Sequence, residues 1–516
     1  MATNTLSYSQ NPLPSGSPPV VSAEKHAMKV RAEARSMSKK ERLSSTFTIA
    51  AAGLGLISDG YQNNLMTMAN VVFKDIYGST YSSTVSTRVS NALLVGKRRG
   101  LVSEIQNRPD SAYTSAVLGQ VFVGLICDRI GRKVALFATT ALIVLGAILA
   151  TAAHASTPAG LFWFLTVARG ITGVGVGGEY PAGSTSASEA ANERSPRNRG
   201  PVFIMVTNFV LSIGGPLAVS VFLIVLSAAG RNHLQTVWRV CFGIGIILPL
   251  GVFVVRMRMM STILYKKGQA CNVPYVLVVK RYWRSLIGTC FAWFLYDFVT
   301  FPNGVFSATI IASVIKNSDI KKTAEWQLLL GAIALPGIFI GAWLCNVIGR
   351  KNTLMLGFSG YLVFGLIIGC AYDRITKIVP LFVVFYGLMQ SSGNMGPGDM
   401  MGLVSVESYP TAIRGTCYGI SAALGKVGAA VGTQAFTPIE TNLGKKWTFI
   451  VAAICGVVGI LVTYFFIPDM TGVDLADEDA KFMEYLAANG WQGQVGEDDD
   501  AELIVSTEGG SLDEKN

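Results

Sequence analysis

Residues 134–153 read VALFATTALIVLGAILATAA, a run of twenty residues without a charged side chain. A helix of this length rises about 30 Å, which matches the hydrocarbon core of a bilayer. Similar apolar runs lie on both sides of it, near residues 46–72, 82–127 (interrupted), 161–181, 201–227, 237–255, 285–314, 326–347, 353–370, 378–404, 416–437 and 447–467. The pattern predicts an all-α membrane protein with twelve transmembrane helices.

The composition excludes most other classes. Of the 516 residues, 51% are hydrophobic and only 14% are charged, whereas soluble proteins average about 25% charged residues. The eight cysteines include no C-x-x-C pair, so neither a disulfide framework nor a zinc site is expected. No nucleophile–base pair or metal cluster is visible, so we expect no enzyme activity and no cofactor.

Charge divides the chain into two six-helix halves, 46–255 and 285–468. The linker between them, 256–284, holds seven Lys or Arg residues and no acid. The tail 1–45 is basic, while residues 469–516 hold 14 acids and 2 bases. Because basic loops stay in the cytoplasm, the linker and both termini are predicted to be cytoplasmic. The net charge of +10 is thus a bias among loops and does not indicate nucleic-acid binding.

The two halves repeat one another. Gly124-x-x-x-Asp128-Arg129-x-Gly131-Arg132-Lys133 follows the second run, and Gly349-Arg350-Lys351 follows the eighth, with Asn346 in place of Asp128. Glu179-Tyr180-Pro181 recurs loosely as Glu407-Ser408-Tyr409-Pro410, and Arg199-Gly200 and Arg414-Gly415 follow these two stretches. Duplicated halves are typical of transporters that rock about a site at the bilayer midplane. We therefore predict that Asp128, Arg129, Arg132 and Arg414 form contacts between helix ends that open and close.

Residues 97–116 do not fit the pattern. They interrupt the second run with Lys97-Arg98-Arg99 and an Arg108-Pro109-Asp110 turn, and such charges cannot face lipid without a large cost. The apolar pieces on either side are each too short to cross a bilayer, but together they make one span. Our hypothesis is that this stretch is a foreign insert, such as an in-frame retained intron.

Six ionisable residues inside the predicted spans stand out, because such groups are costly there and indicate function: Asp59, Arg169, Glu179, Asp297, Asp399 and Lys426. The alternative is that they pair to hold helices together, which applies most to Arg169 and Asp399. The three histidines lie in the N-terminal tail and the outer loops. Proton transfer inside the membrane must therefore use carboxylates.

Two polar stretches indicate a central cavity. Ser58–Asn64 places polar side chains in the middle of the first span, which requires contact with protein or water. In the seventh span Trp293, Asp297 and Phe301 are four residues apart and share one helical face, and Pro302 is expected to end that helix. Gly173-x-Gly175-x-x-Gly178 fits a dinucleotide fingerprint by letter, but it lies inside an apolar helix and predicts close helix packing.

The motif around Asp128, with twelve spans in two halves, resembles the major facilitator superfamily. Gly177-Gly178-Glu179-Tyr180-Pro181 and Gly425-Lys426-Val427-Gly428 narrow the resemblance to its phosphate:proton symporter family, from about Ser44 to Asp469. The resemblance implies proton coupling through Asp59, Glu179 and Asp297. It also implies a substrate site made of Tyr180, Asn208, Trp293, Asp297, Phe301, Gly398 and Lys426.

Three departures from the phosphate porters are Glu179 for Asp, Phe301 for Tyr and Gly398 for Asn. They remove polar contacts to a bare phosphate, and Gly398 is expected to leave room for a larger substrate. In these features the chain resembles the fungal glycerophosphodiester permeases. That resemblance implies proton-driven import of a glycerophosphodiester, such as glycerophosphoinositol, across the plasma membrane.

Other functions remain open at this point. An inorganic phosphate:proton symporter shares nearly every site residue. A sugar or polyol porter suits the charged pair Asp297 and Lys426 less well. A nutrient-sensing receptor on a transporter fold would be favoured by a long cytoplasmic extension, and the tails here are short. The expected partners are a small anion, protons and the lipid bilayer, the oligomeric state is left open, and the acidic run Glu497–Asp500 is expected to be a solvated end.

Overall fold

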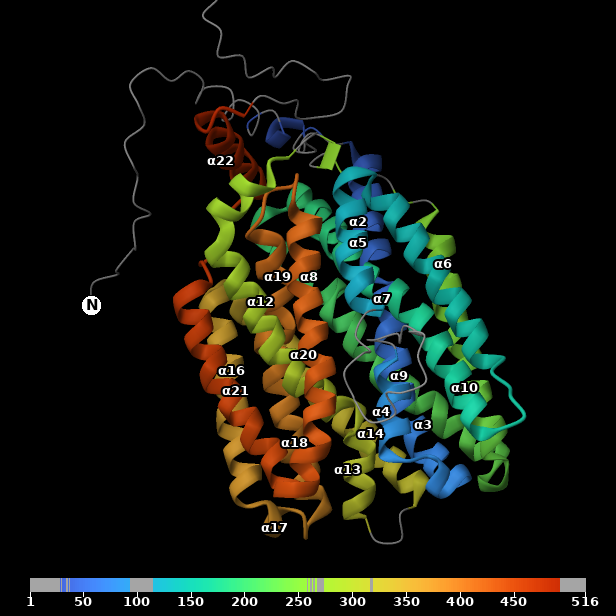
Figure 1. Ribbon diagram of the computed structural model, residues 1–516. Coiled ribbons are helices and arrows are strands. Elements are labelled where there is room, and N and C mark those ends of the chain that lie inside the picture. Colours follow the sequence, from blue (N-terminus) through green and yellow to red (C-terminus); the bar gives the residue numbers. More distant parts are fainter. Residues whose placement is uncertain are drawn as a thin grey trace, which may run out of the picture.

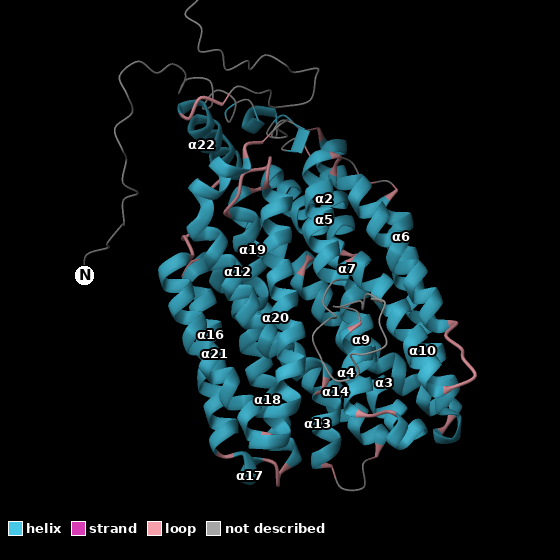
Figure 2. Cartoon of the chain, in the orientation of Figure 1, coloured by secondary structure: helices cyan, strands magenta, loops and turns pink. Residues whose placement is uncertain are grey.

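The computed structural model describes residues 28, 30–33, 36, 38–92, 115–257, 259, 262, 265–266, 273–315 and 319–491. Over these residues the regular structure is helical and includes no strand (Figure 2). The helices form two bundles that lie side by side, the first in blue and green and the second in yellow to red (Figure 1). The fold is therefore the predicted all-α architecture of two six-helix halves.

The first half contains the helices of the six predicted N-terminal spans, several of them interrupted. They are α2 (Lys39–Gly53), α3 (Leu56–Tyr77), η1 (Gly78–Thr80), α4 (Ser83–Asn91), α5 (Ser115–Arg129), α6 (Arg132–Thr151), α7 (Pro158–Arg194), η2 (Pro196–Asn198), α8 (Arg199–Val206), α9 (Asn208–Ala229), η3 (Arg231–His233) and α10 (Leu234–Arg256).

The second half follows the same order. It comprises α12 (Tyr275–Val305), α13 (Ser307–Val314), α14 (Ile320–Ala334), α15 (Pro336–Val347), α16 (Arg350–Cys370), α17 (Tyr372–Ile375), α18 (Val379–Gly393), the π-helix η5 (Asn394–Gly398), α19 (Asp399–Glu407), α20 (Arg414–Leu443) and α21 (Lys446–Phe466). A further helix, α22 (Leu475–Ala488), lies across one end of the molecule, opposite to α17 (Figure 1). We call these ends the α22 end and the α17 end.

Eight helical stretches among the described residues are long and apolar enough to cross a membrane by themselves. The predicted spans near 46–72, 82–127, 378–404 and 416–437 are not among the eight, although they are helical where they are described. These spans lie where helices meet other helices: α20, for example, packs against α5, α7 and α12. A helix that is shielded from lipid by protein tolerates polar and small residues.

The outer surface of the two bundles is apolar. Large side chains such as Ile224, Ile247, Trp343, Ile454 and Phe465 are more than half exposed. In water such a surface would be unstable, but lipid tails solvate it. The exposed apolar surface and the long apolar helices are those of a multi-pass membrane protein.

The second span is built from two described pieces. Both α4 and α5 pack against α7, as two parts of one crossing would. Residues 93–114 lie outside the described residues, so the hypothesis of an insert stays a prediction for nearly all of its length. Its last two residues, Ser115 and Ala116, belong to α5, where Ala116 is buried. The insert and its bounds, 97–116, therefore stay a prediction.

The glycine pattern in α7 serves packing, as predicted. A Cβ atom on Gly175 would lie 2.6 Å from the carbonyl oxygen of Thr139, and one on Gly178 would lie 2.4 Å from the Thr139 methyl group. Only glycine allows α6 and α7 to approach so closely. The stretch is continuous helix with no strand before it, so it cannot form a dinucleotide-binding turn.

Two sequence boundaries need correction. Pro302 does not end the seventh span, because α12 continues to Val305, and the Asn303 side chain donates to the carbonyl oxygen of Val299 at 2.8 Å. Arg256 was assigned to the basic linker, but it is the last residue of α10 and is 1% exposed. Its guanidinium group forms an ion pair inside the first half, as described below.

Candidate functional site: a cavity between the two halves

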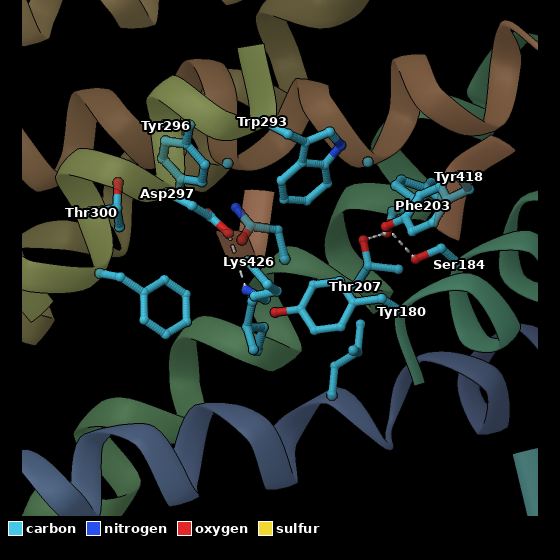
Figure 3. A pocket seen from close by; sticks show the side chains of 16 residues that line it. Tyr180, Ser184, Phe203, Thr207, Trp293, Tyr296, Asp297, Thr300, Tyr418 and Lys426 are labelled. Carbon is cyan, nitrogen blue, oxygen red and sulfur yellow. Dashed lines mark hydrogen bonds and ion pairs between the residues drawn. The ribbon is translucent and has the colours of Figure 1, made fainter. Parts of the chain in front are cut away.

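One cavity of about 120 Å³ lies between the two bundles (Figure 3). Both halves line it with aromatic and polar side chains. The lining residues are Leu56, Tyr180, Ser184, Phe203, Thr207, Asn208, Leu211, Trp293, Tyr296, Asp297, Thr300, Phe301, Gly398, Gly402, Tyr418 and Lys426. All seven residues predicted for the substrate site are in this set, so the structure brings them together in one place.

A buried ion pair lies at the centre of the cavity. The Lys426 ammonium donates to Asp297 Oδ2 at 3.2 Å, and both side chains are 3% exposed (Figure 3). The ammonium also lies 4.3 Å from the ring centroid of Phe301 and 4.9 Å from that of Tyr180. Aromatic faces stabilise a cation that has little water around it. Lys426 uses only one of its donors on Asp297, so it can also bind an anion in the cavity.

Asp59 lies behind the cavity wall and is reached through Tyr180. The Tyr180 hydroxyl donates to Asp59 Oδ2 at 2.7 Å, and the amide of Asn63, one turn along α3, donates to Oδ1. Asp59 is 2% exposed and does not line the cavity itself. The polar run of the first span thus connects to the site through a single phenol hydroxyl.

Glu179, one of the three residues predicted for proton coupling, does not line the cavity. It points into the first half, where Arg256 binds both of its oxygens at 2.6 Å and Thr139 donates to it at 2.7 Å. Adjacent residues on a helix point about 100° apart, so Tyr180 faces the cavity while Glu179 faces α6 and α10. This bidentate pair occupies both carboxylate oxygens of Glu179 and turns them away from the cavity.

Asn208 and Asp399 join the two halves beside the cavity. The Asn208 amide donates to Asp399 Oδ1 at 2.7 Å, from α9 to α19. Gly398 was predicted to leave room for a larger substrate, but the space beside it is also used by protein groups. A Cβ atom there would lie 2.9 Å from the Tyr296 hydroxyl and 3.2 Å from Asn208 Nδ2. The absent side chain makes room for these two polar groups.

Arg169 holds the first half together. Its Nε atom donates to the carbonyl oxygen of Val89 at 3.1 Å, and its Nη1 atom donates to that of Gln62 at 3.5 Å. These bonds tie α4 and α3 to α7. Arg169 thus connects helices through backbone carbonyl oxygens, whereas the alternative given above was that it pairs with another ionisable residue.

The sequence analysis missed five polar side chains of the cavity: Ser184, Thr207, Tyr296, Thr300 and Tyr418. Ser184 and Tyr418 share a hydrogen bond of 3.0 Å across the two halves (Figure 3). A helical spacing of four was the available signal, since Ser184 follows Tyr180 and Thr300 follows Tyr296 by one turn.

At the α22 end, buried charges join the halves. Arg132 donates to Asp128 at 2.6 Å and to Glu189 at 2.9 Å, and Arg414 of the second half donates to the same Glu189 oxygen at 2.9 Å. Asp128 also accepts from the backbone of Gly415 at 3.0 Å, in the first turn of α20. A helix N-terminus favours an anion, so Asp128 caps α20 from across the interface. Arg129, also predicted here, is exposed at the end of α5.

A second cluster repeats this arrangement with the halves exchanged. Glu407 accepts from Arg199 of the first half at 2.7 Å and from Arg350 at 3.2 Å, and Arg350 also donates to Asn346 at 3.0 Å. Arg350 and Asn346 thus correspond to Arg132 and Asp128, as the repeat predicted. However, the counterpart of Glu407 is Glu189 and not Glu179, so the earlier alignment of that motif was wrong.

Within the part of the chain that the structure describes, no group of three or more His, Cys, Asp or Glu side chains is placed to hold a metal ion. The cavity therefore offers one ammonium group, one carboxylate beside it and several hydroxyl and amide donors. Such a site can bind a small anion next to a carboxyl group.

Comparisons with known proteins support a transporter. A family model described as "Sugar (and other) transporter" matches residues 45–265 and 258–482. Glycerophosphoinositol permease 1 of Candida albicans is 52% identical over 477 residues, which cover 91% of this chain and 88% of that protein. Glycerophosphoinositol transporter 1 of Saccharomyces cerevisiae is 50% identical over 482 residues, which cover 92% and 89%.

Among solved structures, the major facilitator superfamily proton:xylose symporter XylE matches with a TM-score of 0.67 and 16% identity, over 85% of this chain and 98% of that one. The chain belongs to the major facilitator superfamily. Its matching model is that of the sugar (and other) transporters, and the resemblance seen in the motifs is confirmed. Because the matched relatives are a permease and a transporter, the prediction that the chain is not an enzyme is also confirmed.

In this major facilitator superfamily protein, weakening the ionic contacts at the α22 end should open that end. We expect Asp128→Asn to remove one charge from the N-terminus of α20 and from Arg132, which costs the closed state about 1–3 kcal/mol. Cys417 lies on α20 close to Asp128 and is 4% exposed. Its thiol should then react with a maleimide several-fold faster in Asp128→Asn than in the wild type.

Two controls accompany this measurement. Asp373→Asn changes an exposed acid at the α17 end and should leave the labelling rate unchanged, and Cys417→Ser subtracts labelling of the other cysteines. An unchanged rate in Asp128→Asn would show that these contacts do not hold the end closed.

The C-terminal helix α22 is packed on this same end of the transporter. Asp479 accepts from the backbone and hydroxyl of Thr411 at 2.6 and 2.7 Å in the second half. Asp474 accepts from Asn192 of the first half at 3.0 Å, and Arg199 donates to the carbonyl oxygen of Val473 at 2.8 Å. Residues 469–491 are therefore an ordered part of the interface, while the run at Glu497 lies outside the described residues.

The position of α22 should depend on pH through Asp479. Burial raises the pKa of this carboxyl to about 6, although Arg414 acts in the opposite direction. The docked carboxyl thus binds a proton more tightly than a solvated one, so acid favours docking, and this contribution is lost as the pH rises through about 6. A nitroxide on Glu484→Cys should show a growing immobile fraction between pH 7 and pH 5. Asp479→Asn should lose that dependence, and release of α22 on acidification would contradict the sign.

Proposed function

We propose that this chain imports a glycerophosphodiester, such as glycerophosphoinositol, together with protons, by alternating access to the central cavity. The observation that carries the proposal is the Lys426–Asp297 pair, a cation and an acid buried together in the cavity between the two halves. The two relatives named for glycerophosphoinositol support the choice of substrate.

The anion binds by displacing Asp297 from the Lys426 ammonium group. A phosphodiester oxygen can take the place of Asp297 on the ammonium, since both are anionic acceptors. Tyr180 and Asn208 lie on the facing wall. Asn208 has a second amide hydrogen for a remaining oxygen, whereas Tyr180 can donate only after it gives up its bond to Asp59. The hydroxyls of Ser184, Thr207 and Tyr418 line the same cavity and suit the glycerol and the polyol headgroup of such a diester.

The proton is needed because Asp297 and the anion compete. Two like charges about 4 Å apart repel by about 4 kcal/mol at an effective dielectric constant near 20. Protonation of Asp297 removes this repulsion, so loading takes up a proton. Asp59 exchanges protons with the site through Tyr180, whose hydroxyl lies between Asp59 and the cavity. Glu179 has no part in this step because Arg256 neutralises it.

The rocking of the halves then exposes the cavity to one side at a time. The α22 end faces the cytoplasm in this proposal, because the basic linker and both tails lie on that side. The ionic clusters around Glu189 and Glu407 must separate for release to the cytoplasm. A plasma-membrane location follows from import of an extracellular nutrient.

The test is uptake by proteoliposomes that contain the full chain. Labelled glycerophosphodiesters with different headgroups and labelled inorganic phosphate are offered singly and then against a 100-fold excess of unlabelled competitor. We expect saturable uptake of a diester that excess diester blocks and excess phosphate leaves largely intact. Uptake of phosphate that also excludes the diester would instead identify an inorganic phosphate symporter. Binding without flux would favour a receptor.

A further inference from the structure

Asp399 is a buried carboxylate that the proposed mechanism does not use. It is the first residue of α19, directly after the π-helix η5, and it is 1% exposed. Its Oδ1 atom accepts from Asn208 of the other half at 2.7 Å. Its Oδ2 atom is buried and has no hydrogen-bond partner.

Among the residues that the structure describes, no basic side chain lies close enough to Asp399 to compensate a negative charge. Of the described lysine, arginine and histidine side chains, none lies within 4.0 Å of it. The titratable groups that face it are Tyr296 from α12 and Cys345 from α15, and neither can become a cation. By contrast, Asp297 has Lys426 and Asp128 has Arg132. An isolated ionised carboxylate in such a place is very costly, so the neutral acid is the form that fits.

The surroundings of Asp399 Oδ2 also favour the neutral, protonated carboxyl group. A Cβ atom on Gly341 would lie 2.1 Å from Asp399 Oδ2 and 2.4 Å from the carbonyl oxygen of Met395. The two oxygens therefore share the small space that the missing side chain of Gly341 leaves. The two oxygens can therefore be at most 4.5 Å apart (2.1 + 2.4 Å), and a proton on Oδ2 makes it a donor that can point toward the carbonyl.

We propose that Asp399 is a second proton carrier, so that two protons accompany each diester through the transport cycle. This inference rests on the proposed function, because it concerns the charge carried with a phosphodiester. In the conformation described, Asp399 holds a proton and accepts from Asn208. When the halves separate, Asn208 withdraws with the first half and water reaches the carboxyl, which then releases its proton as an ordinary aspartic acid does near neutral pH.

The second proton changes the net charge that crosses. A phosphodiester has one ionisable oxygen and is a monoanion, so one proton makes transport electroneutral and two make it carry one positive charge. One charge moving through 100 mV gains about 2.3 kcal/mol, which corresponds to an accumulation of about 50-fold. A membrane potential can therefore drive uptake only if the second proton is carried.

The experiment uses proteoliposomes with equal pH on both sides and an inside-negative potassium diffusion potential of about 100 mV. With labelled glycerophosphoinositol, the wild-type chain should accumulate about 50-fold. Asp399→Asn keeps the hydrogen bond to Asn208 and should still exchange labelled diester across the membrane. The internal concentration of the label should not rise above about the external one. Asp373→Asn, an exposed acid on α17, is the matched control and should behave as the wild type.

Accumulation by Asp399→Asn at the wild-type level would overturn the proposal. So would wild-type uptake that ignores the potential, and that result would leave the proposed diester transport intact, whereas absence of any diester uptake would remove both. If Asp399→Asn does not fold, the ratio of protons to labelled diester taken up by the wild type decides: two supports the proposal and one overturns it.

Discussion

Replacing Asp297 with asparagine is expected to abolish net uptake of the diester while leaving the protein able to bind it. Asparagine keeps the shape and can still contact Lys426, but it neither competes with the anion nor takes up a proton. The lost competition is worth about 4 kcal/mol for charges about 4 Å apart, so the anion stays bound and uptake should fall at least about 100-fold.

The decisive measurement for this variant is diester binding between pH 5 and pH 8. Because loading of the wild type takes up a proton at Asp297, its affinity should fall as the pH rises. The affinity of Asp297→Asn should be high and should vary much less with pH. Full uptake by Asp297→Asn, or an unchanged pH dependence of binding, would count against the role given to Asp297.

Replacing Lys426 has the opposite effect on binding. We expect Lys426→Met to weaken diester binding about 10- to 150-fold, because a charge-assisted hydrogen bond is worth about 1.5–3 kcal/mol. It should also destabilise the protein, since Asp297 then remains buried without its counter-ion, and breaking a buried pair costs about 3–5 kcal/mol. Equilibrium binding and thermal unfolding measure the two effects separately.

The double variant Asp297→Asn with Lys426→Met is the matched control. It leaves no isolated charge, so its thermal stability should return toward that of the wild type, while its affinity for the diester stays low. If affinity returned together with stability, Lys426 would act only through folding and would not be the group that binds the anion.

Much of the cavity could be predicted from sequence because its residues follow helical geometry. Trp293, Asp297 and Phe301 lie on one face of α12 by their spacing alone, and Lys426 is too costly inside a membrane to lack a role. The resemblance to phosphate porters added Tyr180, Asn208 and Gly398. The structure brings all of these to one cavity, although their roles in transport stay proposals.

The errors come from information that a linear pattern does not hold. Nothing in the run Glu179-Tyr180 says which of the two side chains faces the other half, so the sequence could not show that Glu179 binds Arg256 inside the first half. Glu407 was also matched with Glu179 instead of Glu189, because the two repeats differ in the number of residues between their acid and their arginine. The function of Gly398 depends on Tyr296, a contact that only the fold creates.

The ion pairs that connect the two halves at the α22 end were predicted only in part. The motif around Asp128 indicated contacts between helix ends, but it did not reveal that Asp128 caps a helix of the opposite half. Nor could composition show that the acidic C-terminal segment supplies Asp479 to this interface. These contacts form only when segments far apart in the sequence meet, 287 residues apart for Asp128 and Gly415 and 68 for Thr411 and Asp479.

The most direct test of coupled transport is the pH inside proteoliposomes when an external glycerophosphodiester is added without any imposed gradient. Our account predicts internal acidification that follows the entry of labelled diester in the wild type and is absent in Asp297→Asn. Entry of the label into wild-type vesicles with no change of internal pH would contradict it.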